Sequence, residues 1–338
     1  MLALLNIIIW ILAILLSVAL LTLLERKLLA ALQRRVGPDT VGIFGILQPI
    51  ADAVKLVTKQ TSSTASSQRF IFYVAPAYAL TLIIFTWAII ASLFLSTNTS
   101  QLNVDDSMDN LNIITETINF VLLYLPHSYQ WLVILAILSL TIYSQLLLGW
   151  AANSAYAFLG SLRSSAALIS YELILSTAAL IPMLMAQSYS FDDLIYNQSA
   201  IKFAIPLLPV FIIFLISSLA EASRVPFDLV EAESELVSGY MTEHASVAFT
   251  LLFLAEYASI LLFSAINAAF WFGTINYINF AFVIAGMLSF VILARALLPR
   301  MRYDRLIHFC WTSLLPIIFS LVIAVPILIY TFSLYPNL

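Results

Sequence analysis

The sequence has very few of the side chains that bind metals and redox cofactors. Its 338 residues include one cysteine, Cys310, and three histidines, His127, His244 and His308, which lie far apart with no ligand spacing. Iron–sulfur clusters, structural zinc and attached haem need several such ligands close together, so none is expected. The sequence also lacks a Walker loop and a G-x-G-x-x-G turn, which argues against a nucleotide site. We therefore expect any electron donor to lie on another subunit.

Charged side chains are also scarce, at 9% of residues, whereas 62% are hydrophobic and the mean hydropathy is +1.03. Apolar runs of about 20 residues recur along the chain, which is the length of a transmembrane helix. We predict an all-α polytopic membrane protein that forms a single integral membrane domain over residues 1–338, with eight transmembrane helices and a short amphipathic interfacial helix. The expected spans are Leu2–Leu24, Ile71–Leu95, Leu132–Gly149, Ala166–Ala186, Phe203–Ala220, Ala245–Phe270, Ile278–Leu298 and Phe309–Tyr335.

Eight spans divide the fourteen Lys and Arg residues very unevenly, because all but Lys202 fall in or beside the odd-numbered loops. Basic loops stay on the cytoplasm-like side of a membrane. We therefore expect these loops to face the matrix or cytoplasm and both termini to lie on the opposite side. The chain starts directly with an apolar span and no targeting segment. This favours insertion from the compartment in which the chain is synthesised, into the mitochondrial inner membrane or, as the alternative, a bacterial plasma membrane.

The first basic loop contains the pattern of an amphipathic helix at about residues 48–59. Pro49 suits a first helical turn. Apolar Ile50, Ala53, Val54 and Val57 recur at helical spacing. Such a helix lies in the membrane interface. Two interpretations remain open, a surface anchor and one wall of a lipid-facing entrance.

Acidic side chains crowd the stretch from Glu221 to Glu256, which follows the fifth expected span and extends into the sixth. Carboxylates held near hydrocarbon usually line a cavity, pair with a cation or carry protons. Close neighbours also disfavour one another's ionisation, so their pKa values become coupled. We predict a proton or cation route here, with an acidic loop at about 221–243. The stretch contains one Arg and no Lys. Its seven carboxylates are Glu221, Asp228, Glu231, Glu233, Glu235, Glu243 and Glu256.

Each of these acids also has a simpler interpretation. Glu256 lies about eleven residues into its expected span, near the middle of the hydrocarbon, where an acid serves a proton relay or pairs with a neighbouring helix. Glu172 is similar but shallower, and Ser170 and Tyr171 are candidate hydrogen-bond partners. Glu231, Glu233 and Glu235 alternate along the chain. They form either a partly buried cluster, in which Arg224 limits the rise of the pKa values, or a loop open to water.

Long ordered motifs resemble the subunit 1 family of respiratory complex I, the proton-pumping NADH:ubiquinone oxidoreductase. The resemblance covers nearly the whole chain. Its motifs are Glu25-Arg26-Lys27, Gly45-Ile-Leu-Gln-Pro-Ile-Ala-Asp52, Gly149-Trp-Ala-Ala-Asn-Ser, Ser170-Tyr-Glu172, Leu219-Ala-Glu221-Ala-Ser-Arg224-Val-Pro-Phe-Asp228, Glu233-Ser-Glu235-Leu-Val-Ser-Gly239, Ala255-Glu256-Tyr and Pro299-Arg-Met-Arg302-Tyr-Asp304.

The resemblance implies eight transmembrane helices around a tunnel for the substrate ubiquinone. It also implies docking to peripheral quinone-site subunits and to small membrane-arm subunits, with flavin and iron–sulfur clusters held by partners. Membrane lipids are expected partners and nucleic acid is not. The residues implied on the quinone tunnel are Arg26, Arg34, Asp52, Phe227, Asp228 and Arg295. Those implied on the proton route are Glu172, Glu221, Asp228, Glu231, Glu233, Glu235 and Glu256.

Three positions depart from the family's usual pattern. Gln60 replaces a frequent Glu and cannot titrate, His244 replaces a common Tyr, and Ala232 replaces a frequent Gly. Two other functions remain open. A proton-coupled secondary transporter would keep the acids without a redox partner, and the membrane anchor of an energy-converting hydrogenase would share the fold without binding quinone.

Overall fold

The computed structural model describes residues 2–61, 67–101, 129–199, 201–228, 239–241, 243–274 and 277–331. Over these ranges the chain is helical and has no β-strand, which confirms the all-α prediction for the part described. The α-helices are α1 (Leu2–Leu32), α2 (Gln48–Thr58), α3 (Arg69–Gln101), α5 (Gln130–Ala152), α6 (Ala155–Ala186), α7 (Phe191–Asn197), α8 (Leu208–Glu221), α10 (Val247–Asn267), α11 (Tyr277–Leu297), α12 (Tyr303–His308) and α13 (Leu315–Thr331).

Four shorter segments complete the order. Two are 3₁₀ turns, η1 (Ile43–Gly45) and η3 (Gly239–Met241). Two are π-helical segments, η4 (Ala268–Phe272), which continues α10, and η5 (Phe309–Leu314), which joins α12 to α13.

Within the described ranges, seven helical stretches are long and apolar enough to cross a membrane. The expected fifth span is shorter than predicted, because α8 has only 14 residues. At 1.5 Å per residue it measures about 21 Å, less than the roughly 30 Å of a hydrocarbon core. Pro206 and Pro209 explain its late start, since proline is tolerated in a first turn but interrupts a helix interior. The count of eight spans is therefore not confirmed.

The fourth expected span begins earlier than predicted, because α6 runs from Ala155 and includes a serine-rich turn before Ala166. Ser161, Ser164 and Ser165 are buried, and each hydroxyl donates to the backbone carbonyl three residues before it, at 2.9, 3.0 and 3.0 Å. These hydrogen bonds satisfy the hydroxyls within the helix, so polar residues do not end it.

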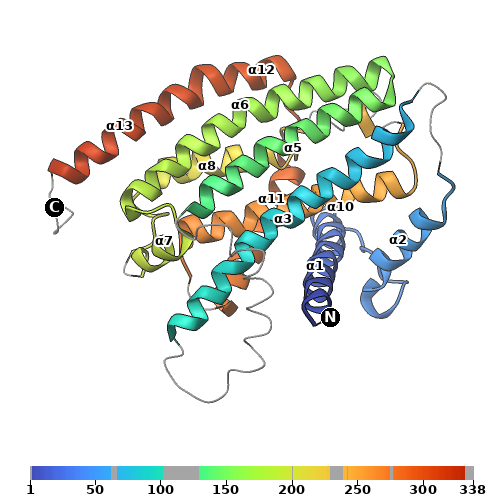
Figure 1. Ribbon diagram of the computed structural model, residues 1–338, viewed down its shortest axis with the longest axis horizontal. Helices are drawn as coiled ribbons and strands as arrows, with labels where there is room; N and C mark the ends of the chain where they lie inside the picture. The colour runs from blue at the N-terminus through green and yellow to red at the C-terminus, as the bar shows by residue number, and fades with distance from the viewer. Residues whose placement is uncertain are drawn as a thin grey trace.

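The helices pack side by side around a continuous apolar core. α5 lies between α3 and α6, α8 packs against α6, and α10 packs against α3 (Figure 1). α1 and α2 lie to one side, where both contact α10. Residues 222–228, which follow α8, contact both α6 and α10, because Phe227 packs on Tyr171 and Arg224 pairs with Glu256.

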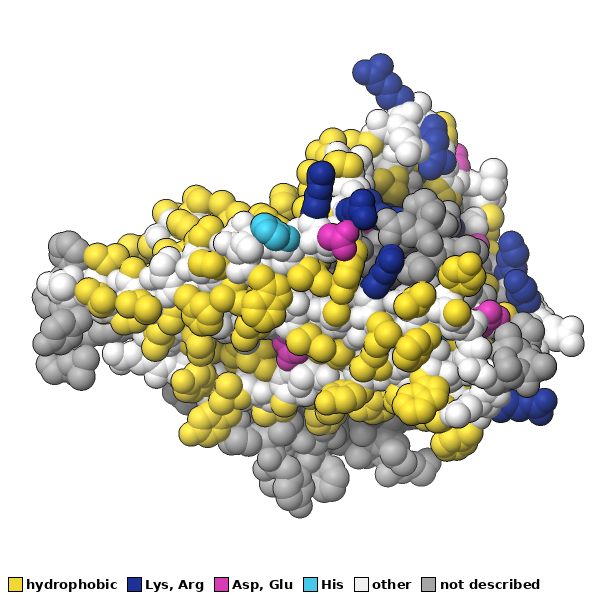
Figure 2. All heavy atoms as spheres, turned by 90° about the horizontal axis from the view of Figure 1, so that it is seen from above, with side chains coloured by type: hydrophobic (Ala, Val, Ile, Leu, Met, Phe, Trp, Pro, Cys, Tyr) yellow, Lys and Arg dark blue, Asp and Glu magenta, His cyan; other side chains and the backbone are white. Residues whose placement is uncertain are grey.

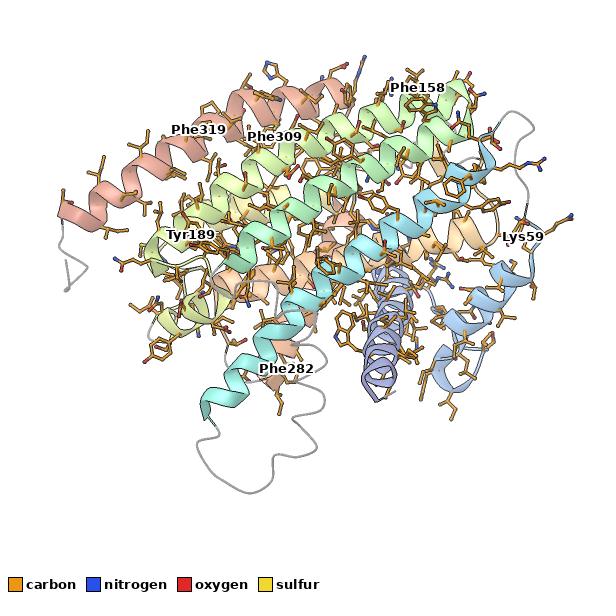
Figure 3. All side chains as sticks on the ribbon, in the orientation of Figure 1. Lys59, Phe158, Tyr189, Phe282, Phe309 and Phe319 are labelled. Atoms are coloured by element: carbon orange, nitrogen blue, oxygen red, sulfur yellow. The ribbon has the colours of Figure 1, made fainter. Side chains whose placement is uncertain are left out.

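A cluster of buried aromatic rings fixes the end of the bundle that lies away from α2. Trp131 of α5, Phe191 of α7 and Phe270 of η4 meet edge to face, with ring centroids 4.8 to 6.2 Å apart. Edge-to-face aromatic pairs add to the stabilisation that burial provides. Tyr189 lies at this end, whereas Lys59 lies at the other (Figure 3).

A helix, α2, lies within one residue of the bounds expected for the amphipathic helix. Its apolar Ile50, Val54 and Val57 are all more than half exposed, and no residue of α2 is buried. An outward apolar face suits a helix that lies in a membrane interface, and that placement remains a prediction. The hydroxyl of Ser246 holds the end of α2, because it donates to the carbonyls of Leu56 and Lys59 at 3.1 and 2.6 Å.

Basic side chains gather at one end of the molecule on the face seen in Figure 2. Lys and Arg lie mainly toward the right of that view, where α2 and the turn between α5 and α6 lie in Figure 1, and hydrophobic side chains cover the left. This separation along the long axis matches the uneven distribution of charge between the two sets of loops.

Candidate functional site

Glu25 lies inside α1 and is buried, with 5% of its surface exposed. Its Oε2 accepts a hydrogen bond of 2.6 Å from the Tyr257 hydroxyl on α10. Its Oε1 accepts a hydrogen bond from Nη1 of Arg295 on α11, with which it also forms an ion pair. A buried carboxylate needs a cation and donors to offset the water it has lost. Glu25 therefore joins α1, α10 and α11 at one polar point.

Arg224 and Glu256 form a second enclosed ion pair. Nε of Arg224 lies 3.4 Å from Oε1 of Glu256, and the two side chains are 4% and 13% exposed. The guanidinium carbon of Arg224 also lies 4.4 Å from the centre of the Tyr257 ring. A cation over an aromatic face is attracted by the ring quadrupole. Arg224 thus contacts both consecutive residues, Glu256 and Tyr257, although their side chains leave α10 in different directions.

The two pairs form one continuous series, which we call the charge ladder: Arg295, Glu25, Tyr257, Arg224 and Glu256. Its charged members alternate in sign from α11 to α10. Interactions between charges are far stronger in a buried environment than in water. A change in the charge of one member must therefore alter the balance of forces on the next.

Sequence reasoning misses two members of the ladder, Glu25 and Tyr257. It places Glu25 at the end of the first span because Arg26 and Lys27 follow it. α1 instead continues to Leu32, so the three consecutive residues point in different directions from a helix interior. The apolar run Leu28–Leu32 after the charges is the signal in the sequence that could have found this. Nothing local marks Tyr257 as the partner of Glu25.

Arg26 and Lys27 connect α1 with the α2 region. Nη1 of Arg26 lies 2.5 Å from Oδ2 of Asp52, and Nε2 of Gln48 donates to the other oxygen of Asp52 at 3.1 Å. Nζ of Lys27 donates to the carbonyl of Phe44 at 2.5 Å. The structure therefore brings the sequence-predicted Arg26 and Asp52 together. Arg34 lies exposed beyond the end of α1 and does not join this group.

Glu221 and Glu256 face a common cavity. Glu221 is the last residue of α8 and is 8% exposed, and its Oε2 has no hydrogen-bond partner among the residues described. The cavity has a volume of about 80 Å³ and lies between α3, α5, α6, η3 and α10. A buried carboxylate oxygen beside a cavity can be satisfied by water or by protonation.

Glu172 is partly buried on α6, but the partners expected for it are wrong. Ser170 donates to Ala166 and accepts from Nε1 of Trp311 at 3.3 Å, and the Tyr171 hydroxyl donates to the carbonyl of Leu306 at 3.4 Å. Residues that follow one another in a helix point about 100° apart. Ser170 and Tyr171 consequently face α12 and η5 and hold them against α6.

The segment after α8 also binds the loop between α11 and α12. Asp228 is 3% exposed, and its Oδ2 lies 3.2 Å from Nη2 of Arg300. The backbone N–H of Met301 donates to the carbonyl of Pro226 at 3.0 Å. Phe227 is buried against Tyr171, with ring centroids 5.4 Å apart. Glu231, Glu233 and Glu235, which were predicted on the proton route, lie outside the residues that the structure describes.

His244 is buried on the N-terminal side of α10, where its ring stacks on Phe72 with centroids 4.1 Å apart. Loss of water around the ring lowers the pKa of His244 to about 4, although the backbone of Leu148 opposes that shift. The imidazole is therefore neutral at neutral pH. It serves as an aromatic packing residue, the role that a tyrosine would fill.

The described residues contain no group of three or more His, Cys, Asp or Glu side chains that suits a metal ion. The arrangement can instead hold and move charge. It has a buried ladder of ion pairs, the further acid Glu221 beside a cavity that it shares with Glu256, and a helix, α2, whose apolar side chains are exposed.

Comparisons with known proteins agree over nearly the full length. A profile of the NADH dehydrogenase family matches residues 5–326. The chain is 40% identical to "NADH-ubiquinone oxidoreductase chain 1" of Mycosarcoma maydis, over 98% of each chain. It is 43% identical to the protein of that name from Candida albicans, over 94% of this chain and 92% of that one. It is 39% identical to an NADH-quinone oxidoreductase subunit of the bacterium Ehrlichia ruminantium, over 98% and 91%.

Proposed function

The chain belongs to the NADH dehydrogenase family, and on that premise we propose that it is a membrane-arm subunit of a proton-pumping NADH:ubiquinone oxidoreductase. In this proposal it walls much of the path of the quinone and begins the acidic route that moves protons. Its partners are the peripheral quinone-site subunits and the adjacent small membrane-arm subunits, and the flavin and iron–sulfur clusters are held by partner subunits.

The observation that carries the proposal is the charge ladder. Reduction of a quinone takes up two protons and changes the charge around its head group. Arg26 follows Glu25 in the chain and pairs with Asp52 of α2, where we propose that the head group arrives. A change of charge there acts on Glu25 and Arg295, then on Arg224 through Tyr257, and finally on Glu256. The ladder thus supports a route from quinone chemistry to a proton-carrying acid.

The path for the quinone itself must be apolar, because ubiquinone is neutral and hydrophobic. The η1 and α2 region supports such an entrance, since Ile43, Phe44, Ile50 and Val54 are all more than half exposed beside α1. Arg34 and the Phe227–Asp228 segment are further proposed contacts along this path.

The acids beyond the ladder form the proposed proton route. Glu256 and Glu221 share one cavity, and Glu172 is close enough to Glu221 for the two charges to interact. Asp228 is buried beside Arg300. Glu231, Glu233 and Glu235 would extend the route between Asp228 and the other acids.

We propose that the chain crosses the inner membrane of a mitochondrion, or a bacterial plasma membrane, eight times. The crossing beyond the seven long helical stretches, the fifth in chain order, is α8 together with the turns at 203–207, whose Ala204 N–H donates to the Trp271 carbonyl at 3.1 Å. Irregular backbone is tolerated at membrane depth where protein satisfies it. The basic loops then face the matrix or cytoplasm, and both termini face the other side.

The proposal is tested by purifying the assembly through a tag on this chain. We expect bound flavin and inhibitor-sensitive reduction of ubiquinone by NADH. Bound nickel with hydrogen evolution would instead identify a hydrogenase anchor. Proton-coupled transport by the chain alone, with no redox partner, would identify a transporter.

A further inference from the structure

The stretch formed by α12, η5 and α13 is the least enclosed of the long apolar stretches in the part of the chain that the structure describes. Only 17% of its most apolar part is buried, against 22% to 56% in the other six. α12 and α13 lie along the upper edge of the bundle in Figure 1, and Figure 2 looks down on that edge. α6 packs against their inner side. Their outer side is therefore an apolar surface for a membrane or a partner to cover.

Two nitrogen-bearing side chains lie at the α12 end of this surface. Arg305 and His308 are both exposed, and they share one face of α12 because they are three residues apart. The neighbouring Asp304 pairs with Arg302 at 3.1 Å. Arg305 forms no ion pair with a carboxylate of the described residues. Its positive charge is therefore available to an anion from outside this part of the chain.

Thr312 fixes the ring of His308. The Thr312 hydroxyl donates its only hydrogen to the backbone carbonyl of His308 at 2.7 Å. The same oxygen lies 3.1 Å from Nδ1 of His308, so Nδ1 carries the hydrogen of that contact. The other ring nitrogen, Nε2, has no hydrogen-bond partner among the described residues. In the protonated ring Nε2 is a second N–H donor beside Arg305.

Trp311 and the outer face of α13 continue the surface away from Arg305. Trp311 is 51% exposed, and its Nε1 donates to Oγ of Ser170 at 3.3 Å, which holds the ring at the surface. Tryptophan is enriched where hydrocarbon meets the lipid head groups. Phe319 and Ile323 are 45% and 65% exposed and share one face, four residues apart. The helix rises about 18 Å from Trp311 to Ile323, close to the roughly 15 Å of hydrocarbon in one leaflet.

The order of these features along one helix matches the order of the parts of an anionic phospholipid. A cation faces the phosphate, an interfacial tryptophan faces the glycerol region, and an apolar face runs beside the acyl chain. Basic side chains on the matrix or cytoplasmic side attract anionic lipid head groups. A transmembrane helix of a partner would cover the apolar face but would bring no anion to Arg305 unless it also carried an acid.

We propose that Arg305, His308 and Trp311 form a binding site for the head group of an anionic phospholipid, whose acyl chain lies along Phe319 and Ile323. Arg305 and the protonated ring of His308 donate to the phosphate oxygens. The inference rests on the proposed function, because the proposed topology places α12 at the matrix or cytoplasmic face of the membrane.

The test uses the fully assembled complex in phosphatidylcholine vesicles that contain a trace of phosphatidylglycerol with a photoreactive diazirine in one acyl chain. Light links the probe to residues beside that chain, and mass spectrometry locates them. Arg305→Gln and His308→Gln each remove a donor for the phosphate, whereas Arg305→Lys retains the charge. Arg35→Gln is the matched control, because Arg35 is also exposed and lies in a basic loop on the same proposed side.

We expect the probe to label α13 between residues 315 and 325. Unlabelled phosphatidylglycerol should compete for the site, whereas soluble glycerol phosphate should not, because it lacks an acyl chain. Arg305→Gln should reduce this labelling about fivefold, the contribution of one basic side chain near an anionic lipid surface. Arg305→Lys should retain most of the labelling, and Arg35→Gln should match the unmodified complex.

Equal labelling of α13 by a phosphatidylcholine probe would overturn the inference, because the contact would then not depend on lipid charge. Unchanged labelling in both Arg305→Gln and His308→Gln would also overturn it, as would labelling of a partner subunit with none on α13. Competition by glycerol phosphate would show a site for free anions instead. If Arg305→Gln fails to assemble, the two probes on the unmodified complex decide. Failure of the proposed function is distinguishable, because the unmodified complex would then lack NADH:ubiquinone turnover in the same vesicles.

Discussion

The hydroxyl of Tyr257 donates to Oε2 of Glu25 at 2.6 Å, while the face of the same ring lies 4.4 Å from the guanidinium carbon of Arg224. One side chain thereby joins two ion pairs that have no atom in common, Glu25 with Arg295 and Arg224 with Glu256. The contact brings together residues 232 positions apart in the sequence. Tyr257 is therefore the position at which the smallest chemical change, the loss of one hydroxyl group, would interrupt the charge ladder.

Tyr257→Phe removes the hydroxyl and keeps the ring under Arg224. We expect assembly to remain normal and NADH:ubiquinone turnover to fall about tenfold, because one bond to a buried carboxylate is lost while both ion pairs persist. Steady-state turnover per assembled complex is the measurement. Tyr303→Phe is a suitable control, since Tyr303 also packs against an arginine, Arg163, but outside the ladder. Full activity of Tyr257→Phe would show that the hydroxyl transmits nothing.

Arg224→Met leaves the Glu256 carboxylate enclosed without this cation. Breaking a buried pair typically costs about 3 to 5 kcal/mol, so we expect a lower midpoint of thermal inactivation and less assembled complex. Arg302→Met is the matched control, because Arg302 pairs with Asp304 at 3.1 Å while both side chains are at least 70% exposed. Exposed pairs contribute little. Equal effects of the two substitutions would contradict the enclosed pair.

The buried imidazole of His244 makes stability depend on pH. The folded protein holds the pKa of His244 at about 4, whereas an unfolded histidine has a pKa of about 6.5. As pH falls below the unfolded value, the unfolded state gains a proton that the folded state rejects, so stability is lost between about pH 6.5 and 4. His244→Phe keeps stacking on Phe72 and removes the titration. Its thermal midpoint should change less between pH 7 and 5, and an identical pH dependence in both proteins would refute the assignment.

The proposed crossing by α8 predicts on which sides engineered cysteines react. Tyr196 precedes α8 and is 74% exposed, and Arg302 follows α11 with an exposed side chain. Three crossings separate them if α8 spans and two if it does not. We expect Tyr196→Cys and Arg302→Cys to react with an impermeant maleimide from opposite sides. The native Cys310 is fully buried and adds no background. Labelling from the same side would exclude a crossing by α8.

Much of the fold follows from local pattern. The helix over 48–58 is predictable almost to the residue, because Pro49 and the spacing of Ile50, Val54 and Val57 act within a few turns. Helix ends are less predictable where polar residues satisfy themselves inside a helix. The expected span starts only at Ala166, yet the helix already contains Ser161, Ser164 and Ser165, whose hydroxyls donate to carbonyls of the preceding turn. The prolines at 206 and 209 also carry the signal for the late start of α8, which the expected span overlooks.

The site is predicted less completely than the helices. Glu256 and Arg224 both stand out in the sequence, but proximity assigns Arg224 to the acids at 231–235, whereas the structure pairs it with Glu256, 32 residues away. Glu25 is missed for the same reason. Its partners come from α10 and α11, and only the packing of three helices brings them within reach. Ion pairs of this kind depend on tertiary distances, which sequence separation does not report.

A double-mutant cycle on Glu25→Gln and Glu256→Gln tests the ladder most directly. Each substitution keeps a hydrogen-bonding side chain and removes one of the two negative charges of the ladder. Inhibitor-sensitive NADH:ubiquinone turnover is measured for both single variants and the double variant in assembled complex. If the ladder transmits charge from Glu25 to Glu256, the second substitution should add little once the first is present, giving a clearly non-additive cycle. Losses that multiply as independent effects would contradict the account.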